Sequence, residues 1–584
     1  MATTRPSPNN LWGWASSHIL RPTQRVRWAD ILLLIGIAGI LFGILGFAHE
    51  ATASYRAGVK IDLSLLALPR YAFFSLCRGI AAFALSVGFT LVYGYWAAKD
   101  RAAEGVLIPL LDILQSIPVL GFMPGVVLSL ASLFPSSNIG LELASILMIF
   151  TGQVWNMTFS FYHSLRSIPS SLSEASEVYR FNWWQRLRWV ELPFSMIGLV
   201  WNGMMGMAGG WFFLMVSEAF VLGNKDFRLP GIGSYMSVAI NAGNVTAMIG
   251  AVLTMIVMIV ALDQLFWRPV VVWTQRFRFE ESAPQEVMRS WFWDLVGHSR
   301  LRGWISRALK RIRRFVPRHR GFVQAPVTRQ RPALKSRRTV TVVTLAMLIA
   351  ALTAGAWKLV DLIARVSAAE WGRILGAGGV TLVRVLASTA LGTLWALPAG
   401  LAIGLSPRLS RIFQPVVQVF ASFPAPMLFP LVVAGLMAVG IPLGSGSIVL
   451  MLLGTQWYIL FNVIAGATAI PSDLKEAAYS YNIRGWQRFR TLYLPVVFPY
   501  LVTGWVTAAG GAWNASIVSE YVTYKGKILT AWGLGSTITK AAAAADFPLL
   551  AASVVTTAVI VVLVNRLLWR RFYKIAEERF SLSR

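Results

Sequence analysis

The stretch AGNVTAMIGAVLTMIVMIVALDQLFW, residues 242–267, decides the fold class of this chain. It carries a single charged side chain, Asp263, and a helix of about 20 apolar residues is long enough to cross the roughly 30 Å hydrocarbon layer of a membrane. The composition agrees, since 56% of the 584 residues are hydrophobic and 13% are charged, against about 25% charged residues in ordinary soluble domains. We therefore expect an all-α, polytopic membrane protein.

Further apolar stretches of comparable length bring the expected number of transmembrane helices to about twelve. They lie at 30–48, 71–98, 106–134, 139–162 and 194–222 before the quoted stretch, and at 339–360, 377–404, 412–437, 446–468, 496–519 and 545–568 after it. Lys and Arg gather before the first span, after the second, between the fourth and fifth, and after the sixth, so the positive-inside rule predicts that both termini are cytoplasmic. No small-residue cleavage site follows the first span before Glu50, and we expect this span to be retained.

Residues that carry catalytic or metal chemistry are scarce in the sequence. The single cysteine, Cys77, cannot form an intramolecular disulfide, and with five scattered histidines it predicts no metal site. No Gly-x-x-x-x-Gly-Lys-Ser/Thr phosphate loop occurs, because Gly526-Lys527 is followed by Ile528 and has no upstream glycine. We expect a chain that binds no cofactor itself, has no catalytic residues and is not an enzyme.

A basic segment, residues 268–338, separates the two groups of spans. It holds 18 Lys and Arg against 4 Asp and Glu, so 18 − 4 = +14, half of the net charge of +28. Apolar residues recur within it at helical spacing: Leu301, Trp304, Ile305, Leu309 and Ile312. This pattern predicts a basic amphipathic helix resting on anionic membrane lipids, and nucleic acid is the disfavoured partner. The expected organisation is a first half at 1–267, a basic cytoplasmic linker at 268–338 and a second half at 339–584.

The two halves are copies of one another. At an offset of 306 the matching pairs are Arg78/Arg384, Pro109/Pro415, Ser116/Ser422, Pro118/Pro424 and Pro124/Pro430. From Gly152 onward the offset becomes 302, with Gly152/Gly454, Trp211/Trp513, Glu218/Glu520, Gly231/Gly533, Gly233/Gly535 and Trp267/Trp569. Such a repeat predicts two similar six-span halves around a pseudo-twofold axis along the membrane normal, with a central pathway between them.

The densest match lies in two cytoplasmic loops outside the spans. They read IPSSLSEASEVYRFNWWQRLRWVELP at residues 168–193 and IPSDLKEAAYSYNIRGWQRFRTLYLP at residues 470–495. Ser171 and Asp473 stand three residues before Glu174 and Glu476, the spacing of a helix N-cap with its reciprocal carboxylate, so a short helix is expected in each loop. Proline is tolerated in the first turn of a helix, and we expect the next span of each half to begin at Pro193 or Pro495.

These two loops resemble the EAA loops of permease subunits of bacterial ABC importers. The first loop carries Glu174, Ala175 and Tyr179, and the second carries Glu476, Ala477 and Ala478. In that family the loop is a coupling helix that docks on an ATP-binding subunit, which is what the resemblance implies for both loops, up to Pro193 and Pro495.

Both loops depart from the family pattern at its glycine, which is Arg180 in the first and Asn482 in the second. Asn tolerates a left-handed backbone, and we expect the second loop to keep the usual bend. Arg adopts this conformation less readily, so a bend is less expected in the first loop.

Four ionisable residues stand inside or beside the expected spans: Arg78, Glu218, Arg384 and Glu520. Buried charges are costly in lipid and usually face a protein interior or water. A guanidinium group suits planar oxyanions, which makes Arg78 and Arg384 candidates for a solute pathway. Two carboxylates would repel an anion, and we favour structural ion pairs of Glu218 and Glu520 with these arginines.

Residues around the two glutamates narrow the resemblance. Ser217-Glu218 and Ser519-Glu520, each followed by a Gly-x-Gly segment, are similar to segments of permeases for nitrate, sulfonates and taurine. The resemblance implies a fused, duplicated permease in a bacterial inner membrane that imports a small solute. An anion of the nitrate, sulfonate or taurine, or bicarbonate class is favoured, and neutral heterocycles remain open. It implies two ATP-binding cassette subunits that hold ATP-Mg, and a periplasmic or lipid-anchored solute-binding protein.

Two other classes of protein remain open on the sequence. A gradient-driven secondary transporter also shows duplicated halves, and a membrane scaffold without transport could use the repeats for packing alone. The paired cytoplasmic loops favour the ATP-driven permease, because a gradient-driven carrier has no use for two docking helices.

Overall fold

A computed structural model of the chain describes residues 28–53, 59–222, 225–277, 290–298, 334–524 and 527–580. The chain divides into two compact units. The smaller unit takes Met1–Phe42 and Arg289–Val327, and the larger takes Gly43–Met288 and Thr328–Arg584. The amphipathic helix expected around Leu301–Ile312 lies outside the described residues.

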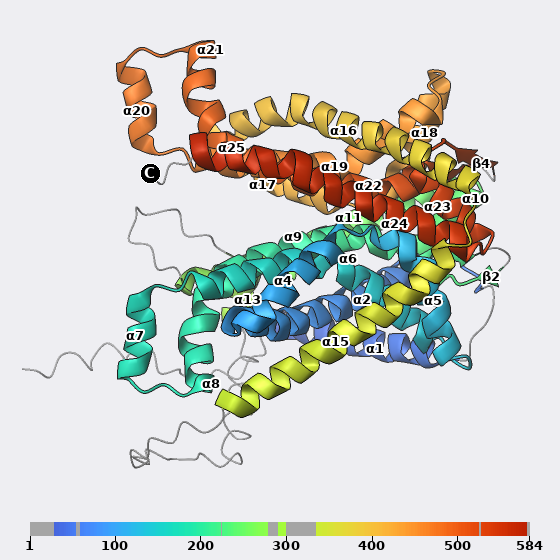
Figure 1. The fold of residues 1–584 in the computed structure, drawn as a ribbon, viewed down its shortest axis with the longest axis horizontal. Helices are drawn as coiled ribbons and strands as arrows, with labels where there is room; N and C mark the ends of the chain where they lie inside the picture. Colours follow the sequence, from blue (N-terminus) through green and yellow to red (C-terminus); the bar gives the residue numbers. More distant parts are fainter. Residues whose placement is uncertain are drawn as a thin grey trace, which may run out of the picture. The chain divides into compact units, whose positions relative to one another are not determined.

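The regular elements in the described part of the first half are helices and one short hairpin (Figure 1). Its elements are α1 (Trp28–Thr52), η2 (Leu65–Ala67), α2 (Leu68–Phe89), η3 (Thr90–Gly94), α3 (Tyr95–Lys99), α4 (Arg101–Ser116), α5 (Val119–Leu133), α6 (Ile139–Arg166), α7 (Ser170–Val178), α8 (Trp183–Arg186), η4 (Leu187–Glu191), α9 (Leu192–Glu218), β1 (Val221–Leu222), β2 (Lys225–Asp226), α10 (Ile232–Asn241), α11 (Val245–Leu262), η5 (Asp263–Trp267), α12 (Arg268–Thr274) and η6 (Gln275–Phe277). A short helix, α13 (Trp291–His298), belongs to the smaller unit.

The second half repeats this order. Its elements are α15 (Leu334–Ile363), α16 (Ala368–Leu405), α17 (Pro407–Ser422), η7 (Ala425–Leu428), α18 (Phe429–Ala438), α19 (Leu443–Thr468), α20 (Ser472–Ser480), α21 (Gly485–Arg488), η8 (Phe489–Tyr493), α22 (Leu494–Ser519), β3 (Tyr521–Tyr524), β4 (Lys527–Thr530), α23 (Leu534–Ala543), α24 (Phe547–Val564), η9 (Asn565–Trp569) and α25 (Arg570–Phe580). The described helices continue into both ends of the segment expected as a linker, since the first half ends its last helix at Phe277 and α15 begins at Leu334.

Ten described helices are long and apolar enough to cross a membrane, in agreement with the expected all-α membrane fold. The third expected span of each half is different, because it is a bent pair of helices: α4 with α5, at 98°, and α17 with η7 and α18, at 83°. The bends follow from two prolines. Pro118 and Pro424 disfavour helical backbone in the residue before them, and Ile117 and Phe423 are accordingly extended, with ψ of 126° and 128°.

The fifth span of each half begins earlier than expected. Continuous helix runs from Trp183 to Glu218 and from Gly485 to Ser519, so Pro193 and Pro495 lie inside the helix and do not start it. A π-helical turn, η4 or η8, stands directly before each proline-containing segment. Proline cannot donate the regular backbone hydrogen bond, and a π turn is a local departure from that regular pairing.

The bent pairs join the two halves within the larger unit. Helix α5 of the first half contacts α22, α23 and α24 of the second, while α17 of the second contacts α9 and α11 of the first. The backbone N–H of Val119 donates to Oδ1 of Asn514 at 2.8 Å across this boundary. One apolar core combines Val119, Leu120 and Met123 with Ile517 and Leu550.

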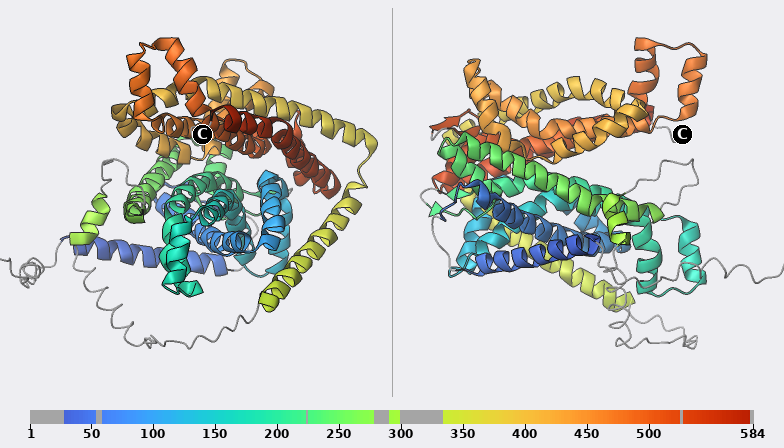
Figure 2. Two further views of the ribbon diagram at one scale, coloured as in Figure 1. Left: turned by 60° about the vertical axis from the view of Figure 1, so that its left-hand side comes forward. Right: turned by 180° about the vertical axis from the view of Figure 1, so that it is seen from behind.

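Each half has one end with the predicted coupling loop and another end with a hairpin. The pairs α7–α8 and α20–α21 project from one end of their helices, and the hairpins β1–β2 and β3–β4 lie at the other end (Figures 1 and 2). The sequence did not predict the hairpins or the short helices α10 and α23 that follow them. Helices α10 and α23 carry Gly233 and Gly535, whose backbone N–H groups donate to the carboxylates of Glu218 and Glu520.

Candidate functional site

Each predicted coupling loop contains the short helix that the sequence indicated, followed by a second helical turn. Helix α7 begins at Ser170 and α20 at Ser472, with Pro169 and Pro471 as N-caps and no side-chain cap. The predicted caps at Ser171 and Asp473 are therefore wrong, because both residues already lie inside the first turn. A capping box does occur in the first loop at Asn182 and Gln185, where each side chain accepts from the other's backbone N–H.

Both loops turn through a left-handed residue at the position of the family's glycine. Arg180 has φ of 50° and Asn482 has φ of 54°. In the first loop Phe181 N–H donates to Ser176 O and Arg180 N–H donates to Glu177 O, the paired bonds of a Schellman motif. Asn482 and the residue after it bond in the same way. The prediction that a bend is less expected in the first loop was wrong, because Arg180 takes the same left-handed conformation as Asn482 and the same main-chain bonds hold the bend.

The side chains of α7 and α20 divide into a buried and an exposed set. Ser176 and Ala478, the third residues of the EAA-like triplets, are buried. The Ser176 hydroxyl donates to Ser173 O at 2.6 Å, which explains how serine replaces alanine there. The remaining predicted contact residues Glu174, Ala175, Tyr179, Glu476 and Ala477 are exposed, as are Arg180 and Asn482.

The two loops are fastened to their helices by different chemistry. In the first half the buried carboxylate of Glu191 accepts from Lys99 Nζ at 2.6 Å and from Arg186 Nε at 3.1 Å. In the second half Leu492 packs with Ala478, Ile470 and Val496 in an apolar cluster. The same task is thus performed by an ion pair in one half and by hydrophobic packing in the other.

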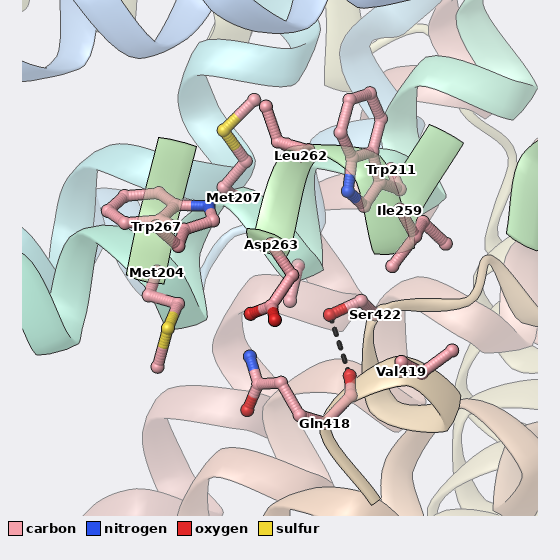
Figure 3. A pocket seen from close by; sticks show the side chains of 11 residues that line it. Met204, Met207, Trp211, Ile259, Leu262, Asp263, Trp267, Gln418, Val419 and Ser422 are labelled. Carbon is pink, nitrogen blue, oxygen red and sulfur yellow. Dashed lines mark hydrogen bonds between the residues drawn. The ribbon is translucent and has the colours of Figure 1, made fainter. Parts of the chain in front are cut away.

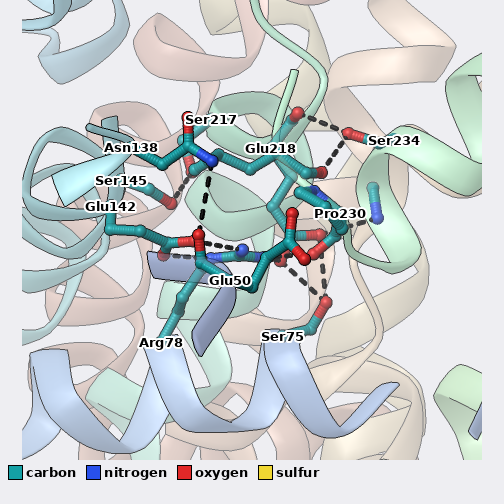
Figure 4. A network of polar contacts seen from close by, with 12 residues as sticks. Glu50, Ser75, Arg78, Asn138, Glu142, Ser145, Ser217, Glu218, Pro230 and Ser234 are labelled. Carbon is teal, nitrogen blue, oxygen red and sulfur yellow. Dashed lines mark hydrogen bonds and ion pairs between the residues drawn. The ribbon is translucent and has the colours of Figure 1, made fainter. Parts of the chain in front are cut away.

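A buried ionic cluster lies near the hairpin end of the first half (Figure 4). Arg78 donates from Nε and Nη2 to the two carboxylate oxygens of Glu142, both at 2.6 Å. Its Nη1 donates to Glu218 Oε1 at 2.6 Å and to Pro230 O at 2.8 Å. Ser75 donates to Glu218 at 2.7 Å, and its hydroxyl accepts from Ile232 N–H. The Arg78 and Glu218 side chains are 0% exposed.

The Gly-x-Gly segments allow the backbone to approach the two glutamates. Gly233 N–H donates to Glu218 Oε2, and Gly535 N–H donates to Glu520 Oε2, each at 2.8 Å. A Cβ on Gly535 would lie 2.2 Å from Ser516 O, and one on Gly233 would lie 2.7 Å from Met215 O. Both contacts are too short for a real side chain, so these positions require glycine.

The equivalent cluster in the second half contains fewer charges. Arg384 Nη1 donates to Glu520 Oε1 at 2.8 Å and to Trp532 O at 2.9 Å. Thr381 takes the place of Ser75, because its hydroxyl donates to Glu520 and accepts from Leu534 N–H. Sequence reasoning named both arginines and both glutamates, and the structure brings each Arg–Glu pair together.

Sequence reasoning missed Glu142, the second carboxylate on Arg78. Helices α6 and α19 run unbroken between this region and the Gly152/Gly454 pair, so the offset of 302 places Gly444 opposite Glu142. A Cβ on Gly444 would lie 3.6 Å from Arg384 Nη2, which places Gly444 beside the guanidinium as Glu142 stands beside that of Arg78. A lone carboxylate inside the apolar stretch 139–162 was the available signal, and a search for matched pairs overlooks it.

Two small cavities lie where each bent pair meets the other half. One has a volume of about 20 Å³ and the other about 40 Å³. In the first, the Asp263 carboxylate points toward Gln418 and Ser422 of α17 (Figure 3). The second is lined by Asn565 at the equivalent position, with Gln115 and Asn514. The space between the halves therefore carries a carboxylate on one side and an amide on the other.

Comparison with known proteins shows the family of this chain. The family described as binding-protein-dependent transport system inner membrane component matches it twice, at residues 90–266 and 390–581, together more than half of the chain. The chain therefore belongs to this family of multi-pass membrane permeases and contains two copies of its domain.

Several curated relatives are similar to one part of the chain. The taurine transport system permease protein TauC of Escherichia coli is 25% identical over 143 residues, 24% of this chain and 50% of the relative. The nitrate import permease protein NrtB of Leptolyngbya laminosa is 24% identical over 143 residues, 24% of this chain and 50% of the relative. The bicarbonate transport system permease protein CmpB of Synechocystis is 26% identical over 142 residues, 24% of this chain and 49% of the relative. The chain spans about half the length of these relatives.

Proposed function

We propose that this chain supplies two membrane domains of an ATP-driven importer for a small oxyanion. Its two halves form the solute pathway, and two ATP-binding cassette subunits, which hold ATP-Mg, dock on the coupling loops. A separate solute-binding protein delivers the solute at the opposite, hairpin end, and both chain termini lie in the cytoplasm. The membrane is a bacterial inner membrane, whose anionic lipids attract the basic segment at 268–338.

The single observation that carries this proposal is the common geometry of the two loops. Each holds a short helix ended by a left-handed residue, and each exposes a glutamate with neighbouring aromatic side chains, such as Tyr179 and Tyr481. Helix α7 or α20 is joined through a Schellman bend and a continuous helix to the fifth span. A force applied to the exposed loop would therefore reach the pathway through rigid helix.

The solute class is supported by two facts. The relatives are named for taurine, nitrate and bicarbonate, all of which carry an oxyanion group. The chain places one arginine in a buried cluster near the hairpin end of each half. Glu142 occupies the fork of Arg78, and the fork of Arg384 suits such a group.

The proposal is tested by purifying the tagged chain from its native membrane in mild detergent and identifying the proteins that accompany it. We expect an ATP-binding subunit and a solute-binding protein with the parent chain. The double variant Glu174→Lys/Glu476→Lys should lose the ATP-binding subunit while the chain itself is recovered in equal amount.

The matched control is Asp361→Lys, which reverses an exposed carboxylate on α15 whose described partner is Arg365. It should recover the ATP-binding subunit as the parent does. Absence of any ATP-binding subunit from the parent, with uptake that collapses with the proton or sodium gradient, would instead identify a gradient-driven carrier.

A further inference from the structure

We propose that Arg384, Gly444 and the first turn of α19 form an oxyanion-binding site that exists in the second half alone. This inference deepens the proposed function, on which its role in transport rests. It assigns solute contact to one of two sequence-equivalent arginines and a structural task to the other.

In the first half, the edge of the guanidinium group formed by Nε and Nη2 binds a carboxylate. Two nitrogens of Arg78, Nε and Nη2, donate to the two oxygens of the Glu142 carboxylate in a bidentate pair, both at 2.6 Å. Such fork-to-fork bonding is the strongest arrangement between a guanidinium group and an oxyanion. Glu142 is thus an anion supplied by the chain itself, and all three nitrogens of the fully buried Arg78 side chain already donate to Glu142, Glu218 or Pro230.

The second half has the same fork without the attached carboxylate. Gly444 replaces Glu142, and among the described residues Arg384 Nε and Nη2 make no hydrogen bond or ion pair. The Arg384 side chain is nine-tenths buried, at 10% exposed, whereas that of Arg78 is 0% exposed. An almost buried arginine therefore keeps two donors aimed at a place that the missing side chain leaves open.

The backbone beside Gly444 adds N–H donors and a positive electrostatic potential, both of which favour an anion. Gly444 is the second residue of α19, a helix of 26 residues capped by Pro442. The first N–H groups of a helix have no partner within it, and they carry the positive end of the helix dipole. An anion on the Arg384 fork would lie next to these amides, as anions do at other helix N-termini.

Charge arithmetic gives the valence of the ligand. The first cluster contains Arg78, Glu142 and Glu218, so 1 − 2 = −1, and the second contains Arg384 and Glu520, so 1 − 1 = 0. One monovalent anion on Arg384 would give the second cluster the same charge as the first. Two parallel N–H donors also favour an oxyanion over a halide, because two acceptor oxygens match the fork. The ligand class is a small monovalent oxyanion such as nitrate, bicarbonate or a sulfonate.

The test is anion binding to the purified full-length chain in detergent, followed by its thermal unfolding midpoint. Sodium nitrate, sodium bicarbonate and sodium methanesulfonate are each titrated at millimolar concentration against sodium chloride at the same ionic strength. We expect at least one oxyanion to raise the midpoint of the parent chain above that in chloride. The variant Gly444→Glu installs the missing carboxylate, and it should weaken the bound anion at least tenfold while raising the midpoint without anion.

Two further variants keep the test decisive. Gly372→Glu adds a carboxylate to an open, exposed position of the same helix as Arg384, outside the expected span at 377–404 and with nothing within 4 Å of its Cβ, and should bind the anion as the parent does. Arg384→Gln should abolish binding, and it decides the question if Gly444→Glu does not fold. Equal oxyanion binding in the parent and in Arg384→Gln, or no effect of any of the three solutes on the parent, would overturn the site. Recovery of the ATP-binding subunit is measured separately, so failure of this site and failure of the proposed function are distinguishable.

Discussion

Lys99 Nζ lies 2.6 Å from Oε1 of Glu191 and thereby ties the end of the second span to the buried end of the loop at 168–193. The second half has no such pair at this position among its described residues, since Leu405 and Tyr493 stand there and pack in an apolar cluster. The two loops can therefore be loosened one at a time.

Lys99→Met is expected to destabilise the first loop by about 1–3 kcal/mol, because it leaves the buried Glu191 carboxylate with fewer donors. Hydrogen–deuterium exchange of residues 168–191 should become faster, while exchange of residues 470–493 stays unchanged. Lys358→Met removes an exposed lysine of α15 and is the matched control, with no expected effect on either loop. Equal acceleration of both loops in Lys99→Met would contradict the assignment.

Arg180→Gly is expected to stabilise the bend of the first loop by about 1–2 kcal/mol, the cost of a left-handed backbone in a residue with a Cβ. Arg180→Val should have the opposite effect, because a β-branched residue is poorly accommodated at φ of 50°. Protection of the Phe181 amide from exchange reports on both changes. Asn482→Gly makes the parallel change in the second loop, and its gain should be smaller because Asn already tolerates this conformation.

Gly535→Ala is expected to lower the free energy of unfolding by about 1–3 kcal/mol, since its Cβ would meet Ser516 O at 2.2 Å and force the backbone to move. Gly379→Ala is the control, because its Cβ has open space. Chemical unfolding in detergent measures both variants. A Gly535→Ala chain as stable as the parent would contradict the prediction that the backbone at position 535 lies too close to Ser516 O for a Cβ.

Glu142→Ala is expected to destabilise the first half by about 3–5 kcal/mol, because it leaves the buried Arg78 with a single carboxylate. Gly444→Ala, the change at the equivalent position, should have little effect on stability, since its Cβ makes only an ordinary contact at 3.6 Å. The difference between their thermal unfolding midpoints is the quantity to measure. Similar midpoints in the two variants would contradict the prediction that Glu142 stabilises the first half while Gly444 contributes little to stability.

The sequence predicted most of the fold because lipid imposes a simple length rule on apolar helices. The duplication also followed from residues in register, such as Pro118 and Pro424. It did not predict that these prolines bend the third span of each half, because a proline in an apolar stretch is compatible with a kinked span as well as with a break. The π turns escaped notice for a related reason, since no residue type marks them.

The candidate site was predictable where both copies share a residue. Arg78 with Glu218 and Arg384 with Glu520 could be named because each pair recurs. Glu142 could not, because its counterpart is Gly444 and a search for shared residues discards unmatched ones. Likewise, Arg180 indicated no left-handed turn, since the main-chain bonds that hold this conformation leave no mark on the side chain.

Fusion of the two halves gives each copy its own codons. In a transporter built from two identical subunits, a change from Glu to Gly at one position alters both sides of the assembly at once. Here Glu142 and Gly444 are encoded by separate codons, so a mutation can alter the proposed oxyanion site beside Gly444 while Glu142 keeps its bonds to Arg78. A library randomised at position 444 alone would sample solute preference on a background whose opposite side stays fixed.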